Sequence, residues 1–455
     1  MDRRTFLRWL GGLGLAGGAA VLFPGRRRDG TPPPGPAPAL PGDGTPSPGA
    51  APVVDVRSFG ARGDGVTDDT AAVQAAIITL GSAGGGTVYF PPGRYLLNTP
   101  TRGSGLNWAL TLNYDRVALV GDGDRSVLTT SYPRMAFVHV AGAWKPGARG
   151  GYGEAPVHPF DPVPRGATAL TLRSPADAGR FAAGDWVTVR TGQTTALPGA
   201  HEPDAEINQV AAVDPASGVL VLRWPLAKPY APEPFPRGHP QAGRPAPFGV
   251  GVVTDRTLQG IALRGLRFES ATSDYAVIGA GVVGLVIEDC SADVRMGFHS
   301  MGHTRDLTIR RCRLHINNRD DAWVWWISTA TGTSDVVIAD NVCTAACSAF
   351  LHLHEGSARV QVLNNVFITQ PSQADRPAIS VRSRGYGLTI RGNSIVNAGN
   401  TAMLFVGPEV ETEGMLAGNS FHSSGDTQYA YYIVHHGAWR IEGNAVQSGL
   451  LTHPP

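Results

Sequence analysis

The second half of the chain repeats a short apolar phrase at intervals close to 25 residues, and this repeat constrains the fold more than any other feature. Successive phrases share one position, and the steps between its occupants are 24, 22, 29, 24, 28, 26 and 25 residues. The occupants are, in order, Leu266, Cys290, Cys312, Asn341, Asn365, Asn393, Asn419 and Asn444. Strand-sized runs at this period, with no helix-sized stretch between them, predict a β-solenoid.

The five asparagines of this position indicate an internal ladder of amides. Stacked coils of a solenoid lie about 4.8 Å apart, so each amide can bond to its neighbour. We therefore interpret the asparagines as structural. Each coil also carries a second apolar strand, seen at 298–301, 322–327, 349–355, 378–384, 402–406 and 430–436.

Composition agrees with a turn-rich all-β protein. The 455 residues include 58 Gly and 36 Pro, and only 16% are charged, which disfavours a helical bundle. The 38 basic residues balance 37 acidic ones, so we expect no nucleic-acid partner. Only Lys145 and Lys228 are lysines.

The N-terminus predicts export. Residues 1–23 combine the Arg3–Arg4 pair with a short Gly-rich apolar run and resemble a twin-arginine signal. We expect a periplasmic, cell-surface or extracellular protein, with membrane contact only if the signal is an uncleaved anchor. Residues 24–52 are rich in Pro and Gly and read as a linker.

Residues 53–97, VVDVRSFGARGDGVTDDTAAVQAAIITLGSAGGGTVYFPPGRYLL, resemble the opening of the pectin-lyase-like superfamily. This group holds polygalacturonases, rhamnogalacturonases, pectate-lyase-type enzymes and mannuronan epimerases. The resemblance implies a right-handed parallel β-helix, with a cap and first coils over 53–165 and the main stack over 248–455.

A capping helix is expected over 70–80, with Asp69 or Thr70 as its N-cap. Its apolar face would cover the first coil. We attribute the acidic residues of this segment to capping and turns: Asp64, Asp68 and Asp69.

Residues 166–247 differ in pattern from the repeats, because apolar and polar residues alternate there with a period of two and turn residues interrupt the alternation. They predict an inserted antiparallel β subdomain, which could wall a substrate groove or be inert. The four cysteines, Cys290, Cys312, Cys343 and Cys347, read as buried thiols, with a disulfide as the weaker alternative.

The second strands carry the richest polar row. Candidate catalytic residues are Asp320, Asp321, His352, His354 and Glu355, and candidate substrate-binding residues are Arg382, Arg384, His299, Trp325 and Trp326. Their order along the coils is similar to that in polygalacturonases, although the local motifs differ. Glycoside hydrolysis needs one protonated and one ionised carboxyl, and Asp320 and Asp321 could divide these roles.

We therefore expect an exported, monomeric glycoside hydrolase acting on polysaccharide. A lyase or uronate epimerase is an alternative, in which arginine, histidine or tyrosine acts, because neither lysine lies on the helix stack. A lyase could need Ca²⁺; otherwise we expect no cofactor and no metal site. The third alternative is a carbohydrate-binding or cell-surface scaffold.

Overall fold

A computed structural model gives the fold. It describes residues 51–102, 107–142, 158–194, 203–234, 244–246, 248–252, 256–273, 275–300, 302–317, 324–329, 332–346, 350–353, 357–369, 377–381, 386–397, 402–407, 413–423, 427–434 and 438–453. The signal, the linker up to residue 50 and Cys347 lie outside these ranges. No helix in these ranges is long and apolar enough to cross a membrane.

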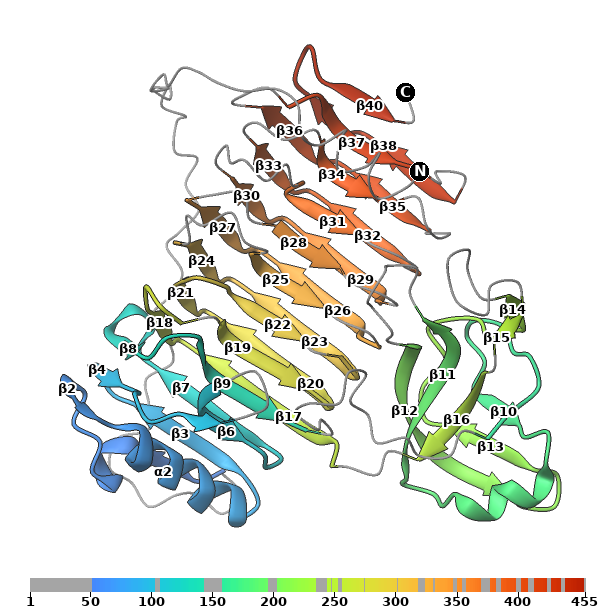
Figure 1. The fold of residues 1–455 in the computed structure, drawn as a ribbon, viewed down its shortest axis with the longest axis horizontal. Helices are drawn as coiled ribbons and strands as arrows, with labels where there is room; N and C mark the ends of the chain where they lie inside the picture. Colours follow the sequence, from blue (N-terminus) through green and yellow to red (C-terminus); the bar gives the residue numbers. More distant parts are fainter. Residues whose placement is uncertain are drawn as a thin grey trace. The chain divides into compact units, whose positions relative to one another are not determined.

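Three sheets, each with eleven strands in the described ranges, are built from one strand per coil (Figure 1). Sheet A contains β1 (Val53–Asp55), β3 (Gly86–Phe90), β7 (Val117–Gly121), β17 (Leu258–Arg264), β20 (Val282–Glu288), β23 (Thr304–Arg310), β26 (Ser334–Ala339), β29 (Ala358–Leu363), β32 (Leu388–Arg391), β35 (Gly414–Ala417) and β38 (Trp439–Glu442). Sheet B contains β2 (Asp64–Asp68), β4 (Gly93–Leu96), β8 (Ser126–Thr129), β18 (Arg267–Glu269), β21 (Ser291–Val294), β24 (Arg313–Ile316), β27 (Val342–Ala345), β30 (Val366–Ile368), β33 (Ser394–Asn397), β36 (Ser420–Ser423) and β39 (Ala445–Val446).

Sheet C contains β5 (Thr101–Arg102), β6 (Asn107–Leu112), β9 (Met135–Ala141), β19 (Tyr275–Ala280), β22 (Phe298–Ser300), β25 (Trp325–Thr329), β28 (Phe350–Leu353), β31 (Ile379–Val381), β34 (Ala402–Val406), β37 (Tyr429–Ile433) and β40 (Leu451–His453). Strands from successive coils pair in parallel, apart from the antiparallel pair β5–β6. The predicted right-handed parallel β-helix is confirmed.

The amide ladder is confirmed atom by atom. Nδ2 of Asn341, Asn365, Asn393 and Asn419 each donates to Oδ1 of the next asparagine, at 2.9, 3.0, 2.9 and 2.9 Å, ending at Asn444. The residue before each ladder position has a positive φ, which turns the chain from sheet A to sheet B; Asn364 is an example, with φ 54°.

Three thiols are also buried, Cys290 and Cys312 in the ladder position before the asparagines and Cys343 in β27. Cys290, Cys312 and Cys343 are free, so the buried-thiol interpretation is confirmed for these three. Burial raises the pKa of the Cys312 thiol well above its usual value. Cys312 is thus an apolar filler that closes the ladder where the amides end.

A capping helix closes the first coil, as predicted. Helix α2 (Thr70–Ser82) buries Val73, Ala76, Ile77 and Leu80. The expected cap is different in detail, because the Asp69 carboxylate makes no capping bond to the helix and instead accepts from the N–H groups of Arg62 and Gly63. Three short 3₁₀ helices lie in turns: η1 (Val56–Phe59), η2 (Gly123–Arg125) and η3 (Pro175–Arg180).

The insertion between β9 and β17 forms an antiparallel sheet with its own core. Its strands, in spatial order, are β10 (Ala169–Thr171), β13 (Val219–Leu222), β12 (Pro203–Asp214), β11 (Trp186–Thr194) and β16 (Phe248–Val252), with a separate pair β14 (Glu233–Pro234) and β15 (Pro245–Ala246). The buried cluster includes Phe160, Val187 and Tyr230. The sheet thus takes in β16, just past residue 247.

Strand β12 of the insertion lies against the helix stack. At Gly332, φ is 73° and an added Cβ would sit 3.0 Å from the carbonyl oxygen of Ala205. Glycine is required there both by its positive φ and by the approach of β12. The insertion and the stack are therefore parts of one compact unit.

Candidate functional site

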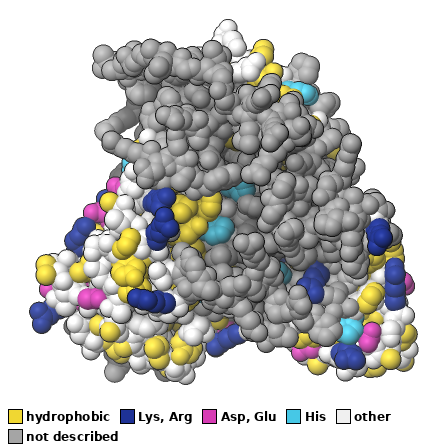
Figure 2. Space-filling view, in the orientation of Figure 1, with side chains coloured by type: hydrophobic (Ala, Val, Ile, Leu, Met, Phe, Trp, Pro, Cys, Tyr) yellow, Lys and Arg dark blue, Asp and Glu magenta, His cyan; other side chains and the backbone are white. Residues whose placement is uncertain are grey.

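The outer face of sheet C carries a row of polar and aromatic side chains, one from each coil. Strand pairing aligns, in order, Thr111, His139, Ile278, His299, Ser328, His352, Ser380, Phe405, Tyr432 and His453. The three histidines from His139 to His352 recur on every second coil, about 9.6 Å apart. In the orientation of Figure 1, histidine side chains are visible in the middle of this face beside hydrophobic ones (Figure 2).

Strand alternation explains why the row points outward. In β28, Leu351 and Leu353 belong to the core, so His352 between them faces the other side of the sheet. His352 is nevertheless only 1% exposed, whereas His299 is half-buried. Of these two, His299 is the more accessible to a substrate.

His299 sits in a cluster of three rings on the outer face. Its ring stacks on Tyr275 with centroids 5.6 Å apart, and Trp325 lies 5.4 Å from His299 and 6.2 Å from Tyr275. All three side chains are half-buried. The cluster joins an imidazole, a phenol and an indole from β22, β19 and β25, which supplies acid–base groups beside a flat apolar surface.

His139, near the N-terminal end of the row, is more deeply buried than His299. It is 2% exposed, and its ring lies 4.4 Å from that of Trp108. Burial lowers the pKa of His139 to about 4. The imidazole is therefore neutral at physiological pH and could accept a proton.

A second aromatic group lies at the C-terminal end of the row. Phe405 and Tyr432 stack at 6.1 Å, and His453 lies 4.5 Å from Tyr432. Phe405 follows His299 by four strands, or about 19 Å at the usual strand spacing. The row thus has aromatic surfaces at both ends, as an extended polymer would require.

The predicted site residues have different outcomes. His299, His352 and Trp325 share the outer face of sheet C, whereas the sequence left the face of His352 and of Trp325 open. Most others fall outside the described residues and stay predictions: Asp320, Asp321, His354, Glu355, Arg382 and Arg384.

Trp326 needs a correction, because we expected it to contact substrate. Its side chain is fully buried, packs 5.5 Å from Phe367 and donates from Nε1 to the carbonyl oxygen of Thr344 at 2.7 Å. The bulge in the pairing of β25 with β28 places Trp325 outside and Trp326 inside. Trp326 therefore belongs to the core.

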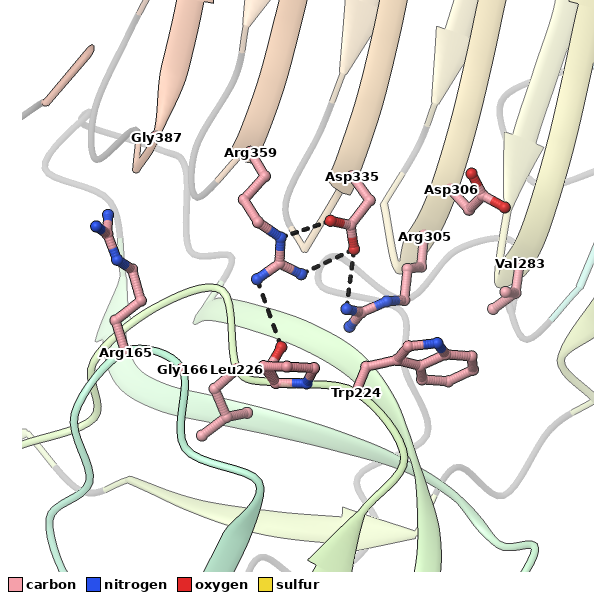
Figure 3. A pocket seen from close by; sticks show the side chains of 11 residues that line it. Arg165, Gly166, Trp224, Leu226, Val283, Arg305, Asp306, Asp335, Arg359 and Gly387 are labelled. Carbon is pink, nitrogen blue, oxygen red and sulfur yellow. Dashed lines mark hydrogen bonds and ion pairs between the residues drawn. The ribbon is translucent and has the colours of Figure 1, made fainter.

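A pocket of about 680 Å³ lies where the insertion meets the first residues of the sheet A strands (Figure 3). The insertion contributes Trp224, Pro225 and Leu226, and Arg165 precedes its first strand. The helix stack contributes Val283, Arg305, Asp306, Asp335, Arg359 and Gly387. Sequence reasoning missed this pocket.

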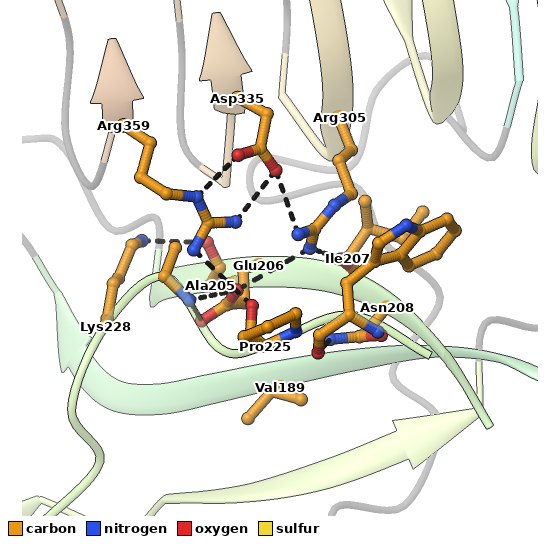
Figure 4. A network of polar contacts seen from close by, with 12 residues as sticks. Val189, Ala205, Glu206, Ile207, Asn208, Pro225, Lys228, Arg305, Asp335 and Arg359 are labelled. Atoms are coloured by element: carbon orange, nitrogen blue, oxygen red, sulfur yellow. Dashed lines mark hydrogen bonds and ion pairs between the residues drawn. The ribbon is translucent and has the colours of Figure 1, made fainter. Parts of the chain in front are cut away.

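An ionic network lies behind the pocket and fastens the insertion to the stack (Figure 4). The Asp335 carboxylate pairs with Arg359 and, at 2.9 Å, with Arg305. Arg305 Nη1 donates to the carbonyl oxygen of Ile207 at 3.3 Å, and its guanidinium lies 4.9 Å from the Trp224 ring centre. The contacts join three successive coils to one edge of the insertion.

The same network reaches a carboxyl inside the insertion. Glu206 is fully buried and accepts from the N–H of Ala227 at 2.9 Å and from Tyr230 Oη at 3.0 Å. Burial raises the pKa of Glu206, and the charge of Lys228 partly offsets this. Both contacts join Glu206 to other segments of the insertion core, so we assign Glu206 to folding.

The described residues contain no group of three His, Cys, Asp or Glu side chains placed to hold a metal ion.

Comparisons with known proteins agree with the fold. Residues 53–140 match the family described as rhamnogalacturonase A/epimerase, pectate lyase-like.

Mannuronan C5-epimerase AlgE6 of Azotobacter vinelandii is 51% identical over 69 residues, which are 15% of this chain and 8% of that protein. Alginate lyase 7 of the same organism is 63% identical over 41 residues, 9% of this chain and 5% of that protein. The chain thus spans less than a tenth of the length of these relatives.

Among solved structures, the tailspike gp61 of Pseudomonas phage phi297 has a TM-score of 0.50 at 14% identity, over 87% of this chain and 75% of that one. At this identity the likeness concerns the fold alone. The chain thus has the right-handed parallel β-helix fold, and its residues 53–140 are similar to the rhamnogalacturonase A/epimerase, pectate lyase-like family.

Proposed function

We propose that this chain is an exported enzyme that removes the C5 proton of uronate units in a polysaccharide, as a lyase or an epimerase. The observation that carries the proposal is the Tyr275–His299–Trp325 cluster on the outer face of sheet C. Export rests on the Arg3–Arg4 pair of the sequence.

The cluster suits proton abstraction because the C5 proton of a uronate is acidified by the adjacent carboxyl group. The imidazole of His299 takes the proton as general base in this proposal, and the phenol of Tyr275 can supply or accept one beside it. In elimination, the C5–H electron pair forms the C4–C5 double bond while the C4–O bond breaks, and the leaving oxygen is protonated. In epimerisation, a proton returns to C5 from the opposite side of the ring.

The carboxylate of the substrate must be neutralised while C5 carries negative charge. Arg382 and Arg384, which follow β31, keep the role predicted for them, that of holding a uronate carboxylate. Trp325 offers its indole face to the sugar ring. The printed names of the relatives, a mannuronan C5-epimerase and an alginate lyase, support this chemistry.

Hydrolysis by Asp320 and Asp321 was our expectation from sequence, and it is now the second candidate. Among the described residues, the outer row of sheet C offers imidazoles and phenols and no carboxylate. Paired carboxylates are the requirement for glycoside hydrolysis. The described groups thus favour proton abstraction.

The test is to incubate the purified chain in D₂O with polymannuronate, polygalacturonate and a neutral glucan, with Ca²⁺ and with a chelator. An epimerase should leave deuterium at C5 of a uronate polymer, which NMR detects. A lyase leaves no hydrogen on C5 of the new end, so it should instead give an unsaturated end that absorbs ultraviolet light.

His299→Gln should lower the rate about 100-fold or more, as loss of a general base does. The matched control is His315→Gln, because His315 is also half-buried but lies on sheet B, where it contacts Thr344. New reducing ends with neither C5 exchange nor an unsaturated end would overturn the proposal in favour of the hydrolase. Binding without any product would favour the scaffold.

A further inference from the structure

One residue of the pocket beside the insertion is not explained by folding. A row of positive-φ residues begins the sheet A strands, and pairing aligns Gly260, Gly284, Asp306, Asp335, Arg359 and Gly387 in it. Glycine suits this conformation best, and three neighbouring coils depart from it. A side chain kept in such a position points to a function.

Two of the three departures have a structural task. Asp335 pairs with both arginines of the network, and Arg359 also donates to the carbonyl oxygen of Pro225 at 3.4 Å. Asp306 differs, because it is exposed and makes no hydrogen bond or ion pair with any described residue. Its carboxylate lines the pocket with its acceptor positions available.

The remaining lining fits the two kinds of surface on a sugar ring. Pro225, Leu226 and the half-buried Trp224 offer an apolar part of the wall. The Trp224 ring is held rigid by Trp186, stacked at 5.9 Å, and by the Arg305 guanidinium at 4.9 Å. Arg165 adds an outer guanidinium. A pyranose has one apolar face and adjacent hydroxyls at its edge, which a carboxylate can accept from in pairs.

We propose that this pocket is an accessory binding site for one sugar ring of the polysaccharide, with Asp306 accepting hydrogen bonds from adjacent hydroxyls and Pro225, Leu226 and the edge of Trp224 against its apolar side. The identity of the polymer rests on the proposed function, and the pocket itself does not. The insertion is then part of substrate recognition.

The pocket is within reach of a polymer bound on sheet C. Asp306 follows His299 by seven residues, so the two Cα atoms are at most about 25 Å apart along the chain. A polysaccharide of several units can contact both places at once. Simultaneous contact raises the affinity for long chains above that for short ones.

The test compares Asp306→Gly with Asp340→Gly. Both aspartates are exposed, and both have a positive φ, which is 58° at Asp306 and 56° at Asp340. Other coils carry glycine in both rows, such as Gly284 in the row of Asp306 and Gly392 in that of Asp340, so both variants should fold. Asp340 does not line the pocket.

Isothermal titration with oligomannuronate, oligogalacturonate and cello-oligosaccharide should show about tenfold weaker binding of at least one of them to Asp306→Gly, equivalent to about 1.4 kcal/mol. Asp340→Gly should bind as the unaltered chain does. Equal dissociation constants for the two variants, or no binding of any of the three, would overturn the proposal. This readout needs no turnover, so it stands apart from a failure of the C5 chemistry, which the D₂O experiment reports.

Discussion

The amide ladder makes a quantitative prediction through Asn393→Asp. Nδ2 of Asn393 donates to the carbonyl oxygens of Val362 and Arg391 at 2.8 and 3.1 Å and to Oδ1 of Asn419 at 2.9 Å. An ionised carboxylate can donate none of these bonds and faces three oxygens instead. At about 1–1.5 kcal/mol for each lost bond, the variant should lose about 4 kcal/mol at pH 7.

The loss should depend on pH with a definite sign. The introduced carboxyl is buried among oxygens, so its folded pKa lies above the unfolded value of about 3.9. Below that value both states are protonated and an O–H can donate one bond. As pH rises from 4 to 7 the unfolded state ionises first, so the deficit relative to the unaltered chain grows.

Urea unfolding at pH 4 and pH 7 measures this deficit. With a slope of about 3 kcal/mol per molar, the midpoint at pH 7 should fall by about 1 M. The control is Asn364→Asp, next to a ladder position but exposed, which should change stability by less than about 0.5 kcal/mol. Equal midpoints for the two variants, or a deficit independent of pH, would refute the ladder argument.

Two further predictions concern burial and docking. The pKa of His139 is about 4 in the folded state and its usual value is 6.5, so the unfolded state takes up a proton first as pH falls. This residue should therefore lower the free energy of unfolding by about 2 kcal/mol between pH 6.5 and pH 5. In His139→Gln, that part of a plot of urea midpoint against pH should be flatter. Gly332→Ala should speed proteolysis of the insertion and destabilise by about 2 kcal/mol, since it adds a clash with Ala205 to the positive-φ strain. The control is Gly443→Ala, which introduces the same positive-φ strain but has open space around the added Cβ. Equal losses of stability in the two variants would count against the contact between Gly332 and Ala205.

The sequence was sufficient to predict the β-helix coils because their apolar phrases recur at a nearly constant interval. The ladder from Leu266 to Asn444 appears at the predicted phase, and helix α2 caps the first coil with the predicted apolar face. Repetition averages out local exceptions, which is why the strand positions were readable. Alternation alone left open whether His352 faces the core or the outside, and the burial of Leu351 and Leu353 in the core settles it.

The bulge at β25 and the contact of the insertion with the helix stack could not be predicted from the periodic pattern. Trp326 turns inward because one extra residue shifts the alternation, and no composition rule marks that residue. The contacts of Arg305 with Ile207 join segments 98 residues apart in sequence. A usable signal did exist, since Asp306 stands in a column where Gly260 and Gly284 show what the backbone prefers.

The ionic network has a consequence for how the molecule unfolds. In a solenoid each coil contacts only its neighbours, so unfolding can begin at an end and spread coil by coil. Here the insertion leaves the stack after β9, yet it is fastened to β23, β26 and β29 through Arg305, Asp335 and Arg359. It therefore adds a second connection across three successive coils that already pair with one another, so the middle of the stack should open as a single cooperative block.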